Sequence, residues 1–361
     1  MNSKNNNTTG SKRWFFTVLA IVASVLVVTF VTTFIVDPFF HYHLPLDGVQ
    51  YPINNERYQN DGLTRLCEYN AVITGTSMTS NFNPTQFDEL YGVDSMKFSY
   101  LGARNKEIDE NLRKSYASGH ELKYVLRSFD YEYFNTDKDD WFPDVVFPTY
   151  LTDDKVLNDV NYLLNKTVIL KNLFGVLEYN ITGQTTPDKD EMSKWNDNYE
   201  FDRQVVLNSY ELEGDRVTAV NTMTEADKKR LSDNLQQNFF DLIDQHPETT
   251  FILFMPPYSV SYWDEVDSKG NVQWLIEAQQ MAIEECFKHS NIELYSFCDD
   301  YELVIDRDEY KDQTHYEQKH NASILQDIHD NNHRLTPDNY MDYIDDISQF
   351  YLNYDYESLK Q

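Results

Sequence analysis

The stretch AVITGTSMTS, residues 71–80, decides the fold of this 361-residue chain. Its apolar first half predicts a short buried strand from Ala71 to Gly75, and the polar half that follows predicts a turn carrying Ser77. Open α/β sheets bind their ligands beyond the carboxyl ends of the strands. We therefore expect the Ser77 hydroxyl at a ligand-binding edge of a sheet.

The sequence on both sides of this stretch predicts an α/β domain. Further strands are predicted over residues 96–100, 123–129, 250–255 and 292–297. Helices are predicted over residues 83–91, 106–118, 273–289 and 319–329, and another begins at the capping box Thr224–Asp227. Residues 340–351 are expected to pack on the domain after the last core helix. Because the strands alternate with helices, we expect a three-layer fold with a parallel, flavodoxin-like sheet covered on both faces.

An insertion interrupts this alternation at about residues 135–215. It contains the dipeptides Phe142-Pro143 and Phe147-Pro148 and a helix-like pattern over residues 156–164. No internal repeat accompanies it. We interpret it as an excursion over the sheet edge that forms a lid or a partner surface.

The N-terminal segment predicts a membrane anchor. Lys12 and Arg13 precede an uncharged apolar span over residues 14–36, which at ~1.5 Å per residue can cross a bilayer core of ~30 Å. Basic residues before the span and acidic ones after it predict a cytoplasmic N-terminus. The length of the span and the lack of an A-x-A site favour an uncleaved anchor over a signal peptide.

The predicted organisation is therefore that of a single-pass plasma-membrane protein. A cytoplasmic tail over residues 1–13 leads into the transmembrane anchor over residues 14–36. A linker and entry loop over residues 37–67 then leads into one extracytoplasmic domain, residues 68–361, which carries the insertion.

The composition limits the classes of partner. The chain has 30 Lys and Arg against 60 Asp and Glu, a net charge of −30, so it repels nucleic acid and we expect no nucleic-acid binding. Cys67, Cys286 and Cys298 leave open either one Cys286–Cys298 disulfide or three free thiols. No metal-ligand spacing and no phosphate-cradling glycine loop occurs, so we expect neither a metal nor a cofactor.

The residues Asp312-Gln313-Thr314-His315 form a close Asp/His pair before a predicted helix. A serine is a weak nucleophile unless a base takes its proton and a third group orients the base. His315 can be that base for Ser77, and Asp312 can fix its tautomer. The alternative is that Ser77 only caps the turn that follows the first strand.

These elements together resemble the SGNH (GDSL-type) hydrolase superfamily. The resemblance is carried by Gly75-Thr76-Ser77, an isolated Gly102 after the second strand, and Asp312-x-x-His315 near the end. Within the superfamily the chain most resembles membrane-anchored bacterial members. Those work beside membrane-bound O-acyltransferases in teichoic-acid D-alanylation or exopolysaccharide O-acetylation. The resemblance spans roughly residues 50–345.

The resemblance implies an SGNH-like fold and a set of catalytic roles. Ser77 matches the nucleophile and donates its own N–H to the oxyanion, Gly102 matches a second oxyanion donor, and Asp312 and His315 match the last block. Thr76 stands where the superfamily name expects Asp.

The third-block Gly-x-Asn-Asp of the superfamily is absent. The third strand ends instead in Arg127-Ser128-Phe129-Asp130, so the side-chain oxyanion donor is unassigned. Candidate substrate-binding residues are Thr76, Arg104, Asn105 and Asp130. The alternatives are that Asp130 caps the next turn and that Arg104 and Asn105 are surface groups.

Three functions follow as expectations. The first is an anchored serine acyltransferase or esterase that acts on a cell-envelope polysaccharide or teichoic acid through Ser77, His315 and Asp312. The second is a catalytically silent SGNH-like scaffold that partners a membrane-bound O-acyltransferase. A sensory or adhesive ectodomain, in which Ser77 lies far from His315, is a third.

Overall fold

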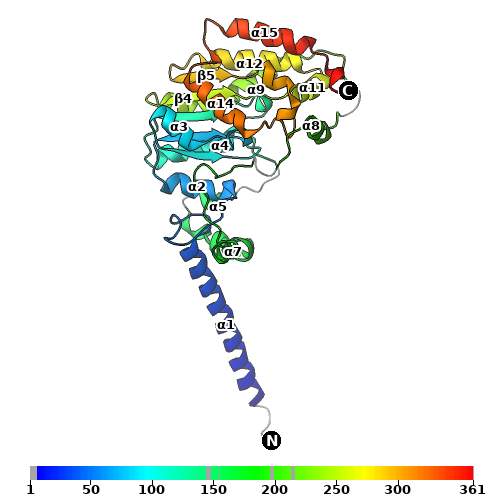
Figure 1. Cartoon of the computed structure of the whole chain (residues 1–361). Helices are drawn as coiled ribbons and strands as arrows, with labels where there is room; N and C mark the ends of the chain where they lie inside the picture. Colours follow the sequence, from blue (N-terminus) through cyan, green and yellow to red (C-terminus); the bar gives the residue numbers. More distant parts are fainter. Residues whose placement is uncertain (1–5, 144–147, 154, 196–198, 213–215, 361) are drawn as a thin grey trace. The chain divides into compact units, whose positions relative to one another are not determined.

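The computed structural model describes residues 6–143, 148–153, 155–195, 199–212 and 216–360 (Figure 1). The chain divides into two compact units, one formed by Met1–Cys67 with Val146–Pro187, the other by Glu68–Val145 with Asp188–Gln361. The predicted insertion is thus shared between the two units. The residues singled out for chemistry all belong to the second, which we call the sheet unit.

The sheet unit is an α/β structure built on one six-stranded sheet. Its strands are β1 (Ala71–Gly75), β2 (Ser95–Ser99), β3 (Tyr124–Ser128), β4 (Thr250–Met255), β5 (Ile292–Ser296) and β6 (Arg334–Leu335). They lie in the order β2-β1-β3-β4-β5-β6, and the first five are parallel. The order 2-1-3-4-5 is that of a doubly wound sheet, in which all five carboxyl ends meet at one edge.

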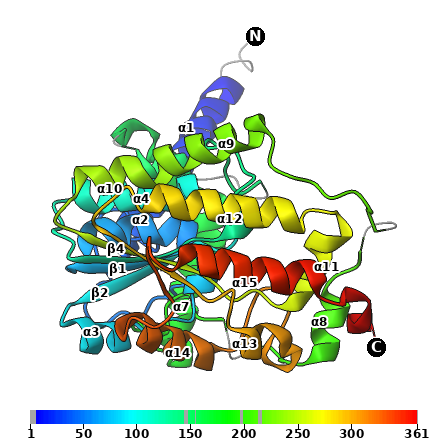
Figure 2. The same ribbon diagram turned by 90° about the horizontal axis from the view of Figure 1, so that it is seen from above.

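Helices cover both faces of this sheet (Figure 2). One face carries α4 (Asn105–Ala117), α9 (Glu225–Leu235), α10 (Asp241–Gln245) and α12 (Val272–Cys286), with α15 (Tyr340–Asn353) packed on α12. The other face carries α3 (Pro84–Tyr91) and α14 (Gln318–His329), which pack on each other. Further helices of the sheet unit are α8 (Arg203–Ser209), α11 (Val260–Ser268) and α13 (Tyr301–Ile305).

The central strands form the core because both of their faces are buried. All five residues of β1 are buried, and so is β4 from Phe251 to Met255. Such continuous apolar runs are typical of parallel strands covered on both sides. The burial fixes the position of the turn that follows β1.

The N-terminal unit contains one long helix, α1 (Asn6–Val36). Its segment Ser11–Val36 is long and apolar enough to cross a membrane. The unit also contains α2 (Glu56–Leu66), α5 (Thr149–Thr152), α6 (Val160–Leu163), the π-helical η4 (Val168–Leu173) and α7 (Phe174–Thr182). A small core of Phe39, Leu151, Tyr162, Leu163 and Val168 holds it together.

The structure corrects several sequence-based expectations. The entry loop contains helix α2, whose polar residues Gln59, Asn60 and Asp61 are buried, so polarity there did not mean exposure. The sheet is mixed, because β6 pairs antiparallel with β5. The helix predicted over residues 156–164 is broken into a 3₁₀ turn, η3 (Val156–Asn158), and α6.

Helix α11 was not predicted, and its buried Trp263 and Val260 lie close after Pro256-Pro257. The three cysteines are all free thiols, which settles the alternative left open by the sequence.

Candidate active site

The turn after β1 presents the Ser77 side chain at the carboxyl edge of the sheet. Gly75 has a φ of +148°, and Thr76 is the N-cap of the 3₁₀ turn η1 (Ser77–Thr79), where its hydroxyl accepts the Met78 N–H at 3.3 Å. Because Thr76 caps the turn, the Ser77 hydroxyl is not used for capping. The capping alternative for Ser77 is therefore wrong.

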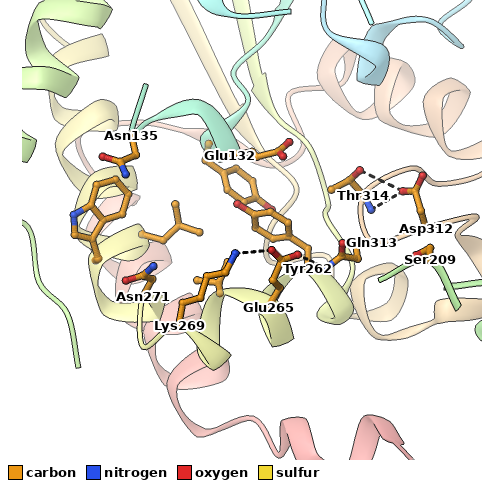
Figure 3. A pocket seen from close by; sticks show the side chains of 14 residues that line it. Glu132, Asn135, Ser209, Tyr262, Glu265, Lys269, Asn271, Asp312, Gln313 and Thr314 are labelled. Carbon is orange, nitrogen blue, oxygen red and sulfur yellow. Dashed lines mark hydrogen bonds and ion pairs between the residues drawn. The ribbon is translucent and has the colours of Figure 1, made fainter. Parts of the chain in front are cut away.

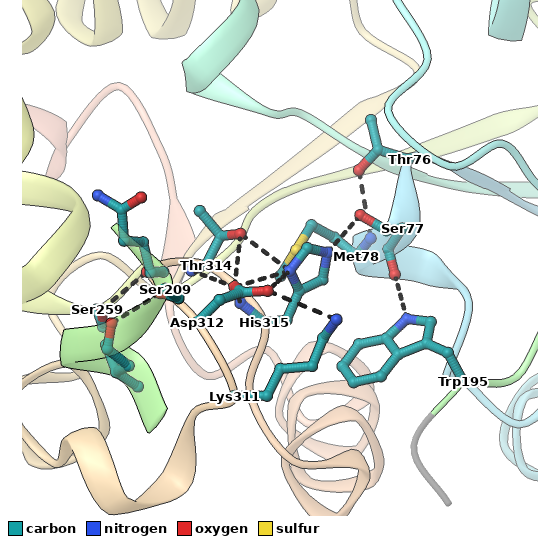
Figure 4. Close-up of polar contacts among 12 residues, drawn as sticks. Thr76, Ser77, Met78, Trp195, Ser209, Ser259, Lys311, Asp312, Thr314 and His315 are labelled. Carbon is teal, nitrogen blue, oxygen red and sulfur yellow. Dashed lines mark hydrogen bonds and ion pairs between the residues drawn. The ribbon is translucent and has the colours of Figure 1, made fainter. Parts of the chain in front are cut away.

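The Ser77 hydroxyl lies against His315 (Figure 4). Its Oγ is 2.7 Å from His315 Nε2, and His315 Nδ1 is 2.8 Å from each of the two Asp312 carboxylate oxygens. The order Ser–His–Asp and both distances are those that a base-activated hydroxyl requires. Ser77 and His315 are both partly exposed, so a substrate can reach them.

Asp312 is held by its own turn. Its Oδ1 accepts the backbone N–H groups of Thr314 at 3.0 Å and His315 at 2.9 Å, an arrangement typical of Asx turns. Lys311 Nζ lies 3.5 Å from Oδ2. Burial of the carboxyl opposes ionisation, but the interactions with His315 and the two N–H groups outweigh it. The pKa of Asp312 is therefore held well below its usual range.

Asp130 supports the turn from beneath. It is buried, and it accepts hydrogen bonds from Ser128 Oγ at 2.5 Å and from the Tyr258 hydroxyl at 2.7 Å. Ser128 Oγ in turn accepts the Thr76 N–H at 3.2 Å. Burial raises the pKa of Asp130. Asp130 is the N-cap residue of η2 (Tyr131–Tyr133), but its side chain makes no capping hydrogen bond. Through Ser128, the carboxylate instead orients Thr76, the residue next to Ser77.

The Ser128 side chain fits under the turn because Gly75 has no side chain. A Cβ atom there would come within 2.2 Å of Ser128 Oγ, and the positive φ also disfavours any other residue. The chain can therefore pass from β1 into the Ser77 turn only with glycine at this position.

Two site residues were not found from the sequence. The Trp195 indole N–H donates to the Ser77 carbonyl at 3.3 Å, and its ring stands edge-on to the His315 ring at a centroid distance of 5.2 Å. Lys311 Nζ lies over the rings of Trp195 and Tyr199, at 4.5 and 3.9 Å from their centroids. Lys311 adjoins Asp312 in sequence, but nothing in the polar segment around Trp195 signals its position.

The other site residues predicted from the sequence, Gly102, Arg104 and Asn105, contact residues outside the Ser77–His315–Asp312 cluster. Gly102 follows β2, has a φ of +66°, and has the Phe142 ring where a Cβ would stand. Its role as an oxyanion donor stays a prediction. Arg104 donates to the Gly102 carbonyl and stacks on Tyr133. Asn105 is buried and bonds to Asn234, so it is neither a surface group nor a member of the Ser77 cluster.

A recess of about 550 Å³ opens beside Asp312 (Figure 3). Three aromatic residues and three acids are among the residues that line it: Tyr131, Tyr262, Trp274, Glu132, Glu265 and Asp312. The Glu132 side chain is open to the recess, but the dense protein around it and the charge of Asp130 raise its pKa to about 7. The recess is therefore acidic and partly aromatic.

Within the described part of the chain, no group of three or more His, Cys, Asp or Glu side chains could hold a metal ion. Comparison with known proteins adds no assignment. No model of a known protein family matches the sequence, and no curated protein matches it significantly.

Lys97 on β2 ties the Ser77 turn to the segment that carries Trp195. It is 1% exposed, and its ammonium donates to the carbonyls of Ser80 at 2.7 Å, Phe82 at 2.9 Å and Asp190 at 3.1 Å. Burial lowers its pKa to about 7, although Asp190 and Glu191 oppose the shift. Only the protonated amine has three N–H groups for three acceptors.

We expect Lys97→Met to destabilise the sheet unit, because each buried carbonyl left without a donor costs about 1–3 kcal/mol. The control is Lys228→Met, whose side chain is half exposed in a surface ion pair and whose loss should stay within about 0.5 kcal/mol. Urea unfolding of both variants measures the difference. Equal stabilities would mean that the Lys97 contacts contribute nothing.

Asp312→Asn should make the free energy of unfolding fall less steeply as the pH is lowered into the acid range. A depressed pKa contributes stability that is complete above the unfolded-state value of about 3.9 and is lost as the pH falls below it. The wild type should thus lose up to ~1.4 kcal/mol more per pH unit than the variant in that window. Melting temperatures between about pH 5 and pH 2, which bracket that value, test this, and parallel curves would contradict it.

Proposed function

We propose that this protein is a membrane-anchored serine acyltransferase or esterase of the SGNH type, acting on a cell-envelope glycopolymer. The proposal is carried by one observation, the chain of contacts from Ser77 Oγ through the His315 ring to the Asp312 carboxylate. The parallel order 2-1-3-4-5 and the placement of Ser77 after β1 also support an SGNH-like fold.

In the first half-reaction Ser77 Oγ attacks the carbonyl carbon of an acyl donor, and its proton passes to His315 Nε2. The Asp312 carboxylate holds the Nδ1–H and stabilises the imidazolium that forms. His315 then gives the proton to the departing alcohol oxygen. The products are the free alcohol and an ester of Ser77.

In the second half-reaction a hydroxyl group takes the place of the departed alcohol. His315 Nε2 removes its proton, its oxygen attacks the Ser77 ester, and the Ser77 oxygen leaves with the proton returned by His315. If the hydroxyl belongs to a polymer, the reaction is acyl transfer, and if it belongs to water, it is hydrolysis. The same residues serve both outcomes.

The negative oxygen of both tetrahedral intermediates needs hydrogen-bond donors. Ser77 is the first residue of η1, where a helical turn gives the N–H no internal acceptor, so this N–H is one proposed donor. Gly102 is the other. Ser128 and Asp130 are engaged beneath the turn, so the end of β3 supplies no amide donor of the kind that the third block provides.

The recess beside Asp312 suits the acceptor. Aromatic faces and carboxylates such as Tyr262 and Glu265 are typical partners for the apolar faces and hydroxyl groups of a saccharide. Because the recess is acidic, a neutral stretch of polymer fits it better than a polyanionic one.

Anchoring follows from α1. The helix is long and apolar enough to span a bilayer, and Lys12 and Arg13 precede its most apolar part. By the positive-inside rule the N-terminus is cytoplasmic and the sheet unit extracytoplasmic, at the plasma membrane.

A second candidate function is a catalytically silent scaffold for a membrane-bound O-acyltransferase. The missing side-chain oxyanion donor favours it, because loss of one such donor typically costs ~10²–10³ in rate. Under this alternative, Ser77→Ala and His315→Ala cells keep normal O-acylation of the envelope polymer. Deletion of residues 14–36 abolishes it.

The test of catalysis is covalent labelling of the purified full chain by a fluorophosphonate. We expect Ser77→Ala to abolish labelling, and His315→Ala to slow it by ~10²–10⁴, the usual contribution of a general base. The matched control Ser118→Ala removes an exposed hydroxyl at the end of α4 and should label normally. Folded wild-type protein that does not label would contradict the proposal.

A further inference from the structure

The N-terminal unit exposes an apolar stripe on the continuous helix formed by η4 and α7. Leu170 on η4 and Phe174, Leu177 and Ile181 on α7 are 54%, 57%, 51% and 74% exposed. The spacing of four, three and four residues places them on one face of a helix. We call these four residues the α7 stripe. Large apolar side chains gathered in this way mark an interaction surface.

The α7 stripe lies next to the end of the membrane span. Helices α1 and η4 pack on each other, and Figure 1 shows α7 nearly end-on while α1 runs along the page, so that the two axes cross. Between them lies a cavity of about 460 Å³, lined by Thr32 and Val36 of α1 together with Leu173 and Leu177. The surface that α1 presents to lipid therefore continues into this cavity and onto α7.

The length of α1 determines how deep η4 and α7 lie relative to the bilayer. The span Ser11–Val36 begins with Lys12 and Arg13. Its uncharged part, residues 14–36, is about 35 Å long at ~1.5 Å per residue, or ~5 Å more than the hydrocarbon core. The last turns of α1 can therefore stand in the interfacial layer, where amphipathic helices lie with their apolar face buried ~5–10 Å deep.

The segment that carries the α7 stripe differs in net charge from the chain as a whole. Residues 160–182 contain Lys166, Lys171 and Glu178 and thus carry a net charge of +1, within a chain of net charge −30. A weakly basic segment can approach anionic lipid headgroups, which the rest of the acidic chain repels.

We propose that η4 and α7 lie in the plane of the bilayer surface, with the α7 stripe and the adjoining cavity filled by lipid acyl chains. The occupant is lipid because the stripe continues the lipid-facing surface of α1. The inference rests on the anchoring part of the proposed function and is independent of the catalytic part. Its consequence is a second membrane attachment that fixes the N-terminal unit against the bilayer.

The test uses the full chain with Cys67→Ser and one added cysteine that carries an environment-sensitive fluorophore. The variants are Ile181→Cys in the stripe, Thr182→Cys as the exposed neighbour turned away from it, and Val22→Cys within the span. Each is reconstituted in phosphatidylcholine–phosphatidylglycerol vesicles that contain acyl-chain-brominated lipid. We expect quenching at Ile181 to exceed that at Thr182 at least about twofold, because only the apolar face is buried in lipid.

The Val22 label separates the possible failures. If Val22 is quenched but Ile181 and Thr182 respond equally, α1 is embedded and the stripe is not in lipid, so the inference is wrong. If Val22 is not quenched, the anchor itself fails, and the inference fails with it. If Ile181 is unquenched in vesicles but shielded from a membrane-impermeant maleimide in native membranes, a protein covers the stripe, which also overturns lipid as the occupant.

Discussion

A single hydrogen bond, between Ser77 Oγ and His315 Nε2, joins residues 238 positions apart, and the proposed chemistry depends on it. The parallel sheet makes it possible. Because β1 to β5 run in the same direction, the turn after β1 and the loops after β5 meet at one edge of the sheet. Without the intervening strands, nothing in either turn would bring Ser77 close to His315.

Each side of that hydrogen bond is held by buried polar groups that would be costly if left unpaired. On the serine side, Asp130 acts through Ser128 on the Thr76 N–H. Lys97 donates to two carbonyls just after the same turn and to a third in the segment that carries Trp195. On the histidine side, Asp312 uses its own backbone turn. Burying a charge without partners costs far more than a hydrogen bond returns. These networks therefore select one arrangement of the site over compact alternatives.

The sequence predicted the parts of the site that are local. Gly75-Thr76-Ser77 and Asp312-x-x-His315 are each contained in a few residues, and an apolar strand or a turn signal adjoins each of them. Trp195 and Lys97 could not be predicted, because each acts through contacts with segments far along the chain. Helix α2 was missed for another reason, because most of the residues that it buries, such as Gln59, Asn60 and Asp61, are polar. The antiparallel β6 is only two residues long, too short to leave an alternation.

Electrostatics around His315 explains how an acidic protein can suit acyl transfer. On the Nδ1 side lies the ionised Asp312, with the acidic recess beyond it. In the proposed reaction, these negative groups favour the positive charge that His315 acquires with the Ser77 proton. The Ser77 N–H at the start of η1 lies on the Nε2 side and, in the same proposed reaction, meets the negative charge that develops on the substrate. As proposed, charge of each sign thus forms next to a preorganised group of the opposite sign, and neither charge is present in the ground state. An interaction of that kind raises the rate without tightening the binding of the ground state.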